Sequence, residues 1–362
     1  MRARAPRLLL FSLLTWLSSS WPAGAQARPQ PAPDPERPRV HLVATGGTIS
    51  NQSGGRLTAD ELIRTIPDVE RWARPESEQF ANVASSELTL TQWLALAKRL
   101  NALLNEDTAL AGIVVTSGTD TLEELAYFLN LTVRSDRPVV VVGSMRNPTT
   151  VGYEGAANLL EAFRVAAEPA SRGRGVLVVL NDEINAARDV TKTDAARLNT
   201  FQSRGYGILG VVDADRIVYY RDVIKRHTSK SEFDVSVMTM LPRVDVLLVY
   251  QDAPGDLIKS AVDRGALGVV LATAGAGATS GSQTDGISYA TGKGVVVALA
   301  TRTGSGRIAA RRRGGEMVAT SGRFDFLIAA EDLAPVKARI LLMLALAQTH
   351  DPVEIQRMFT EY

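Results

Sequence analysis

Hydroxyl, carboxylate and amine side chains gather in three short segments of this sequence. Thr45 opens a Thr-Gly-Gly-Thr run, Thr119 and Asp120 lie in a Ser-Gly-Thr-Asp-Thr run, and Lys192 lies in a Val-Thr-Lys-Thr run. A threonine hydroxyl is a weak nucleophile until a base removes its proton, and a lysine whose pKa is lowered by desolvation can be that base. Two threonines, an aspartate and a lysine are therefore sufficient for acyl transfer without histidine or cysteine.

Glycines and a predicted helix add to this chemistry. Gly46 and Gly118 allow the main chain to approach a ligand closely. A helix that begins after Thr119 would direct its N–H groups at a developing oxyanion. The same runs also fit a phosphate-binding turn, a plain strand-to-helix connection or an N-cap cluster, and a lone lysine such as Lys192 is usually a surface residue. The pattern alone leaves these alternatives open.

The elements that position these segments alternate along the chain. Short Val-rich runs predict strands of a parallel sheet covered on both faces, at residues 40–44, 113–116, 139–142, 176–180, 244–249, 269–272 and 295–300. Amphipathic stretches predict helices at residues 90–104, 121–133, 155–167, 257–264 and 336–347. This alternation predicts an α/β fold, with a hairpin at residues 208–220. Ligands of such folds bind beyond the carboxyl ends of the strands, which is where the three polar runs lie.

The composition excludes several classes of function. The chain has 362 residues, with 40 Lys and Arg against 39 Asp and Glu, so it lacks the basic surface of a nucleic-acid binder. It has no cysteine, and its three histidines (His41, His227 and His350) lie far apart in the sequence. We therefore expect no metal and no cofactor. The sequence has no P-loop, no GxSxG motif and no GxGxxG run after a predicted strand, so ATP chemistry, the usual Ser-His-Asp route and dinucleotide binding lack support.

The N-terminal residues have the pattern of a signal for export. Three arginines precede a short apolar run, and Ala-Gly-Ala at residues 23–25 fits a cleavage site, so residues 1–25 are predicted to be a signal peptide. A Pro-rich tether (residues 26–38) follows. We expect a catalytic domain at 39–222, a linker at 223–243 and a second α/β domain at 244–362. The predicted location is periplasmic or secreted, without a membrane anchor after cleavage.

The ordered motifs also resemble a known family, the bacterial type II, exported L-asparaginases and glutaminase-asparaginases. The matching segments are ATGGTI at residues 44–49, GTDTLEE at 118–124, PVVVVGSMR at 138–146, RDVTKT at 188–193 and KARILLMLAL at 337–346. The resemblance spans residues 40–362. It implies a larger N-terminal α/β domain, a smaller C-terminal one, and a homotetramer in which a neighbouring subunit completes each active site.

The resemblance also implies roles for individual residues. Thr45 matches the nucleophile, and the group that activates it maps onto Thr119, Asp120 and Lys192. Ser85 matches the serine that holds the substrate carboxylate. The remaining residues expected around the substrate are Gly46, Gly118, Ser86 and Glu87. The partner implied is a small amide, with L-asparagine as the leading substrate.

The sequence departs from the family pattern around the substrate's amino group. Ser117 and Ser86 stand where the family has His and Gln, the loop at residues 51–56 has no Tyr, and Ala-Gly-Ala at 276–278 replaces Asn-Gly-Asn. The family's Glu has no clear counterpart, and Arg311, Arg312 and Arg313 lie in its region, in what we expect to be a solvated loop. Glutamine or another amide is therefore an alternative substrate. A periplasmic solute-binding protein is an alternative of a different class.

Overall fold

The structure of the protein is a computed structural model that describes residues 36–313, 316–318 and 327–362. The predicted signal peptide and most of the predicted tether lie outside the described residues. Within the described part of the chain, no helix has the length and hydropathy that a membrane span requires.

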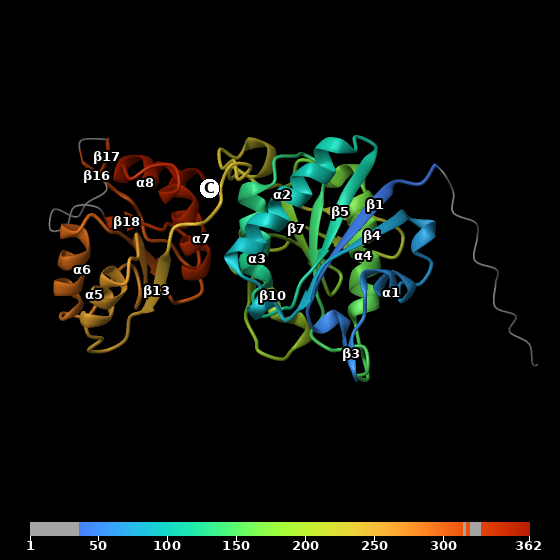
Figure 1. Cartoon of the computed structure of the whole chain (residues 1–362), viewed down its shortest axis with the longest axis horizontal. Coiled ribbons are helices and arrows are strands. Elements are labelled where there is room, and N and C mark those ends of the chain that lie inside the picture. Colours follow the sequence, from blue (N-terminus) through green and yellow to red (C-terminus); the bar gives the residue numbers. More distant parts are fainter. Residues whose placement is uncertain (1–35, 314–315, 319–326) are drawn as a thin grey trace, which may run out of the picture. The chain divides into compact units, whose positions relative to one another are not determined.

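The larger sheet has eight strands, and the order of these strands indicates where a ligand would bind. The strands run β12-β11-β8-β7-β6-β5-β1-β4 (Figure 1); β4, β1, β5, β6 and β7 pair in parallel, and β8 is antiparallel to β7. Their bounds are β1 Arg39–Gly46, β4 Arg74–Val83, β5 Leu110–Thr116, β6 Val139–Val142, β7 Val176–Leu180, β8 Glu183–Ala186, β11 Gly210–Val212 and β12 Ile217–Tyr219. Because β4 and β5 lie on opposite sides of β1, the strand order reverses there. Such a reversal is where open α/β sheets bind ligands.

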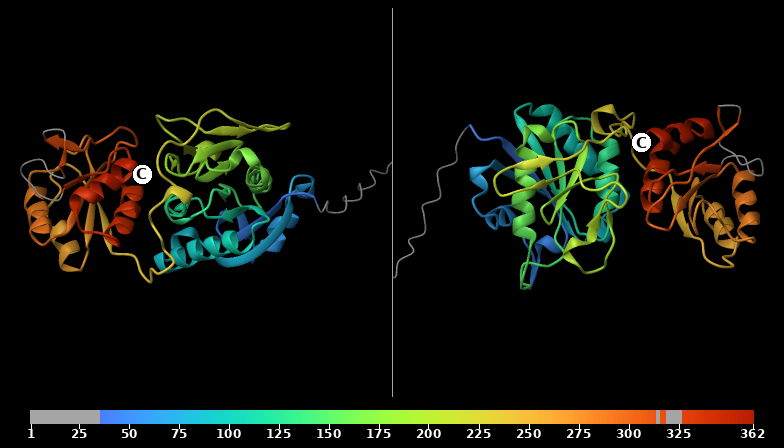
Figure 2. Two further views of the ribbon diagram at one scale, coloured as in Figure 1. Left: turned by 90° about the horizontal axis from the view of Figure 1, so that it is seen from above. Right: turned by 180° about the vertical axis from the view of Figure 1, so that it is seen from behind.

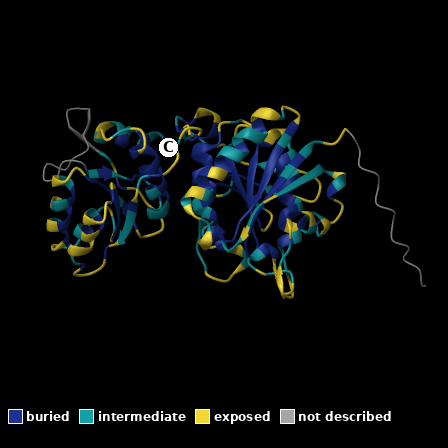
Figure 3. Ribbon diagram, in the orientation of Figure 1, coloured by how far each residue is buried: buried dark blue, intermediate teal, exposed yellow. Residues whose placement is uncertain are grey.

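Helices cover both faces of this sheet, as its continuous apolar strands require (Figures 2 and 3). In β6, Val139 and Val141 belong to one core cluster and Val140 and Val142 to the other. The first cluster includes α2 (Leu90–Glu106) and α3 (Leu122–Thr132), and the second includes α1 (Ala59–Arg64) and α4 (Gly155–Ala167). Thr89 caps α2 in a capping box with Gln92, which fixes where the helix begins.

The C-terminal part contains a parallel four-stranded sheet in the order β13-β14-β15-β18. The strands are Val244–Leu248, Gly268–Thr273, Val296–Thr301 and Leu327–Ala329. Helices α5 (Asp256–Asp263) and α6 (Gln283–Gly292) share one core cluster with this sheet, while α7 (Pro335–Leu346) and α8 (Pro352–Glu361) belong to the cluster on its other face. The predicted two-domain α/β fold is confirmed.

Each predicted strand overlaps an observed strand, and β11 and β12 form the predicted hairpin. The sequence patterns missed β4, because this edge strand is polar: Glu76 pairs with Arg39, and Glu78 pairs with Arg99. The prediction of a loop at Arg311–Arg313 was wrong, because the backbone of these residues forms strand β16, which pairs with β17 (Glu316–Val318).

The proposed linker at residues 223–243 contains a single 3₁₀ turn, Thr228–Lys230, among the elements of the structure. Phe233 and Val235 of this segment are buried in the larger core cluster. Ser231 donates a hydrogen bond to the main-chain oxygen of Leu131 at the end of α3. We keep the division at 39–222 and 244–362 as a proposal.

Candidate active site

Three adjacent parallel strands deliver the predicted site residues to one edge of the sheet. Thr45 lies at the carboxyl end of β1, Ser85 follows β4, and Thr119 follows β5. All three side chains are buried, with exposed fractions of 1%, 6% and 5%. The strand-end argument from the sequence placed Thr45 and Thr119 at this edge, whereas Ser85 was expected there only from the family resemblance, because β4 was not predicted.

Glycines allow these segments to pack main chain against main chain. Gly46 and Gly47 have φ values of +103° and +90°, a region that favours glycine. A Cβ on Gly47 would lie 2.3 Å from the nitrogen of Gly118, and one on Gly118 would lie 2.8 Å from Oγ of Ser85. The turn after β1 thus contacts the turn after β5, which in turn contacts Ser85.

Thr45 is held by the last residue of the neighbouring strand β5. Its Oγ1 donates a hydrogen bond of 2.6 Å to the main-chain oxygen of Thr116, and its N–H donates to Oγ1 of Thr116 at 3.0 Å. A carbonyl oxygen accepts a hydrogen bond but does not remove the proton. Attack by Thr45 therefore requires its hydroxyl to leave Thr116 and turn toward a substrate. Thr116 has a positioning contact that the motif comparison did not predict.

Lys192 contacts both of its predicted partners. Its Nζ donates to Oγ1 of Thr119 at 3.0 Å and lies 2.7 Å from Oδ1 of Asp120. The Lys192 side chain is 14% exposed, whereas that of Asp120 is 77% exposed. Because Lys192 is the donor to Thr119, the hydroxyl hydrogen of Thr119 stays free to point at another acceptor.

Glu123 in the first turn of α3 fixes the backbone beneath Lys192. Its Oε1 accepts hydrogen bonds from Oγ1 of Thr191 at 2.9 Å and from the N–H of Lys192 at 3.2 Å. Strand β9 (Thr191–Lys192) has only two residues and pairs with β10 (Phe201–Gln202). Sequence reasoning missed Glu123, because an acid in the first turn of a helix is already favoured by the helix dipole and gives no separate signal.

Of the other residues predicted to bind substrate, Gly46 and Gly118 are buried, whereas Ser86 and Glu87 lie at the surface. Ser86 and Glu87 are exposed and belong to the 3₁₀ helix Ser85–Glu87. The carboxylate of Glu87 accepts a hydrogen bond of 3.3 Å from the N–H of Ala84. Glu87 is thus engaged with its own turn through Oε2.

The positions that depart from the family pattern have identifiable surroundings. Ser117 is fully buried, and its Oγ donates to the main-chain oxygen of Gly118. Residues 51–56 form a short hairpin of β2 (Asn51–Gln52) and β3 (Gly55–Arg56). Tyr153, which the motif comparison did not single out, donates a hydrogen bond of 2.9 Å to the main-chain oxygen of Ile49. The side chains of Arg311–Arg313 lie outside the described residues.

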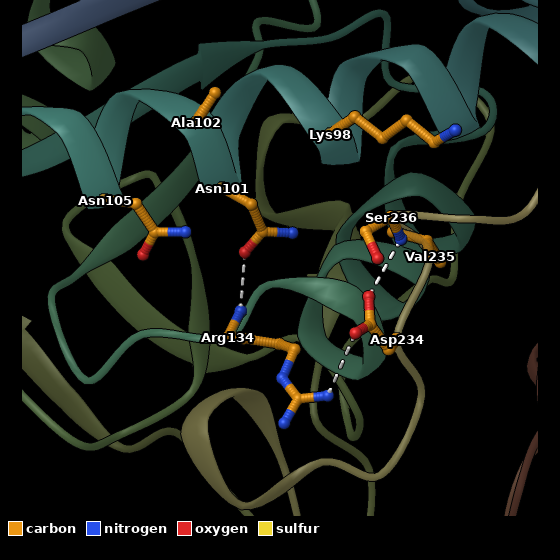
Figure 4. A pocket seen from close by; sticks show the side chains of 8 residues that line it. All are labelled: Lys98, Asn101, Ala102, Asn105, Arg134, Asp234, Val235 and Ser236. Atoms are coloured by element: carbon orange, nitrogen blue, oxygen red, sulfur yellow. Dashed lines mark hydrogen bonds and ion pairs between the residues drawn. The ribbon is translucent and has the colours of Figure 1, made fainter.

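A hollow of about 490 Å³ lies away from these residues, between the exposed side of α2, Arg134 and the segment 234–236. Arg134 donates through its N–H to Asn101 and lies 3.8 Å from Asp234 (Figure 4). None of the predicted site residues lines it. In the described ranges, no group of three or more His, Cys, Asp or Glu side chains is arranged to hold a metal ion.

Comparison with known proteins covers both parts of the chain. Residues 39–225 match the family model described as asparaginase, N-terminal, and residues 243–359 match the glutaminase/asparaginase C-terminal domain. The chain belongs to the asparaginase family. The resemblance predicted from the ordered motifs is therefore confirmed, and the protein is an asparaginase-type amidohydrolase rather than a solute-binding protein.

Individual members of the asparaginase family match over most of their length. L-asparaginase 2 of Bacillus subtilis is 42% identical, over 90% of this chain and 87% of its own. A probable periplasmic L-asparaginase of Haemophilus influenzae is 38% identical, over 90% of this chain and 93% of its own. The crystal structure of a probable cytoplasmic L-asparaginase from Campylobacter jejuni superposes with a TM-score of 0.84 at 38% identity, covering 90% of this chain and all of that chain.

Proposed function

We propose that this protein hydrolyses the side-chain amide of L-asparagine to L-aspartate and ammonia, with Thr45 as the nucleophile. The observation that carries this proposal is the contact of Lys192 with both Thr119 and Asp120. This contact occurs at the sheet edge where Thr45 and Ser85 end adjacent strands. A nucleophile, a proton-accepting group and a carboxylate-binding hydroxyl are therefore supplied from one edge.

The first half of the reaction acylates the enzyme. Oγ1 of Thr45 leaves the Thr116 carbonyl and attacks the amide carbon, so that a C–O bond forms and the C–N bond breaks. The proton of Thr45 ends on the leaving nitrogen, which departs as ammonia. Lys192 in its neutral form takes up this proton through Thr119 and returns it, since a neutral amine has a lone pair to accept it.

The second half releases the acid. A water molecule attacks the acyl ester on Thr45, its proton passes to Oγ1, and the C–O bond to the enzyme breaks. In both halves of the reaction, the hydroxyl of Ser85 donates a hydrogen bond to the α-carboxylate of the substrate. Asp120 lies beside Lys192 and stabilises the lysine when it is protonated.

Weak binding of the substrate's α-amino group belongs to the same proposal. Ser86 is shorter than the Gln expected there, Ala276 and Ala278 carry no hydrogen-bonding side chain, and Glu87 is engaged with its own turn. A hydrogen bond to a charged group contributes about 1.5–3 kcal/mol, so the absence of two raises KM for asparagine roughly 10²-fold or more. Glutamine or another amide is the second candidate substrate for this reason.

Export and assembly complete the proposal. The N-terminal sequence has the charged, apolar and small-residue pattern of a signal peptide, which supports a periplasmic or secreted location. A relative in Haemophilus influenzae carries the name periplasmic, whereas the Campylobacter jejuni structure carries the name cytoplasmic. We propose a homotetramer with shared sites, in keeping with the family resemblance.

A screen of ammonia release tests the substrate. It compares L-asparagine, L-glutamine, D-asparagine, N-acetyl-L-asparagine and short peptides with internal asparagine. We expect the highest catalytic efficiency on L-asparagine, a KM above the micromolar range, and incomplete rejection of the N-acetyl compound. Higher efficiency on glutamine or on a peptide would favour the second candidate. Absence of ammonia release from every compound would overturn the proposed reaction.

A further inference from the structure

A fully buried lysine in the C-terminal part of the chain contacts the segment that carries Lys192. Lys337 is 1% exposed, and its Nζ donates to the main-chain oxygens of Ala187 at 2.9 Å, Arg188 at 3.0 Å and Val190. An ammonium group has three N–H donors, so all of them are used on this one stretch of backbone. Lys192 follows Val190 by two residues.

The place of Lys337 in its own helix does not account for this burial. Helix α7 begins at Pro335, so Lys337 lies in its first turn, where the helix dipole disfavours a positive charge. Burial lowers the pKa of Lys337 to about 8, although the charge of Glu123 acts against this change. The burial of a charged amine and its position in the first turn of the helix both destabilise the fold. The three hydrogen bonds to main-chain carbonyls offset this cost.

Glu123 connects Lys337 to the same segment from the other side. One carboxylate oxygen, Oε1, accepts from Thr191 and from the N–H of Lys192, as described above. The other, Oε2, is buried with no hydrogen-bond partner and lies 3.9 Å from Nζ of Lys337. The lysine is therefore the group that compensates the charge of Glu123 on the face turned away from Lys192.

We propose that Lys337 and Glu123 are positioning residues that together set the Lys192 side chain against Thr119 and Asp120. Neither is proposed to touch the substrate. The short strand β9 has two residues, so its own pairing with β10 restrains Lys192 weakly. The inference rests on the proposed function, because it assigns importance to Lys192 in that reaction.

The test compares variants in two backgrounds, wild type and Lys192→Met. In wild type, Lys337→Met is expected to lower kcat roughly 10²-fold with KM changed less than about threefold, since remote positioning acts on the chemical step. In Lys192→Met, the same change is expected to lower the residual rate less than about threefold, because residues that act through one another are not additive. An equal loss in both backgrounds would overturn the proposal.

A second variant distinguishes a loss of positioning from misfolding of the Lys337→Met protein. Glu123→Gln keeps an oxygen for Thr191 and the Lys192 N–H but removes the charge that faces Lys337. It is expected to show the same dependence on the background as Lys337→Met. Lys225→Met is the matched control: its Nζ also donates to a main-chain oxygen, but this is the oxygen of Thr360 in α8, and its interaction with the 187–192 segment is the electrostatic one with Arg188. The control is expected to retain kcat within about twofold.

Acetylation of Lys192, followed by peptide mass spectrometry, gives a readout that needs no activity. The Lys192 amine bonded to Thr119 and Asp120 is expected to react slowly, and Lys337→Met is expected to raise its labelling rate about tenfold, whereas Lys225→Met leaves it unchanged. An unchanged rate in Lys337→Met would overturn the positioning. Failure of the wild-type protein to release ammonia, with labelling raised as expected, would overturn the reaction but not the arrangement.

Discussion

At the scale of single residues, the proposed reaction assigns proton transfer to Lys192. It contacts Thr119 and Asp120, and its side chain is largely shielded from solvent. Replacement by Met removes the amine, and replacement by Arg retains a charge that is not given up at working pH. We predict that both variants lose at least about 10³-fold in kcat for ammonia release while their melting curves match the wild type. An active Lys192→Arg would mean that Lys192 acts through its charge alone.

Glu161 of α4 gives a pH-dependent prediction for stability. Burial and the neighbouring Asp182 raise the pKa of its carboxyl to about 8, from 4.5. The contribution of the protonated form is complete below pH 4.5 and is lost as the pH rises toward 8, because the unfolded chain ionises first. Glu161→Gln does not titrate, and its amide oxygen can still accept from the N–H of Asp182.

We therefore predict that Glu161→Gln exceeds the wild type in melting temperature by a margin that grows between pH 5 and pH 8 and then levels off. The margin at pH 8 is expected to be at least about 3 °C larger than at pH 5. Thermal melts across this range measure it. A margin independent of pH would contradict the buried, protonated state of Glu161.

At the scale of elements, the turn after β1 must pack against the turn after β5. Gly47→Ala places a Cβ 2.3 Å from the nitrogen of Gly118, at a φ of +90°. Overpacking costs about 1–3 kcal/mol and the positive φ about 1–2 kcal/mol more. We predict a lower melting temperature and a large loss of ammonia release. Gly54→Ala is the control, since it shares a positive φ of +87° but meets no atom within 4 Å.

The contrast between these two glycines isolates the contact between the turns. Gly54→Ala is expected to lose stability from backbone strain alone and to retain most of the activity. Equal effects of the two substitutions on activity would contradict a site built on the contact of Gly47 with Gly118.

Sequence patterns predicted the elements whose signals are local. Val-rich runs marked the covered strands, and the residues after β1 and β5 marked the edge of the sheet where Thr45 and Thr119 lie. They did not predict β4, whose charges pair with Arg39 and Arg99. Nor did they predict the roles of distant contacts. The contact of Lys337 with residues 187–190 joins positions about 150 residues apart, and no local pattern encodes it.

The sequence motifs also could not predict the direction of the Thr45 hydroxyl. They identify the residue type and the strand end, but the rotamer depends on the Thr116 carbonyl of the adjacent strand. The surroundings of Glu87 are a similar case, because its capping contact with Ala84 depends on the local turn. Motifs thus predicted which residues gather, and the packing determined what each one contacts.

At the scale of the whole molecule, the described chain carries large apolar side chains at its surface. They include Tyr220, Ile224, Val237, Met240 and Leu248, with exposed fractions from 56% to 95%. Burial of such side chains between subunits would add to the stability of an assembly. We predict four chains in sedimentation analysis and loss of activity on dilution below the dissociation range. A monomer with full activity would contradict the shared site.

The central claim is that Thr45 carries the acyl group. Its most direct test is ammonia release from L-asparagine by wild type, Thr45→Ala and Thr48→Ala, the last being the same substitution at the other threonine of the same run. We predict that Thr45→Ala loses roughly 10³-fold or more in kcat with an unchanged melting curve, while Thr48→Ala stays within about tenfold of wild type. Wild-type turnover by a folded Thr45→Ala protein would contradict the account.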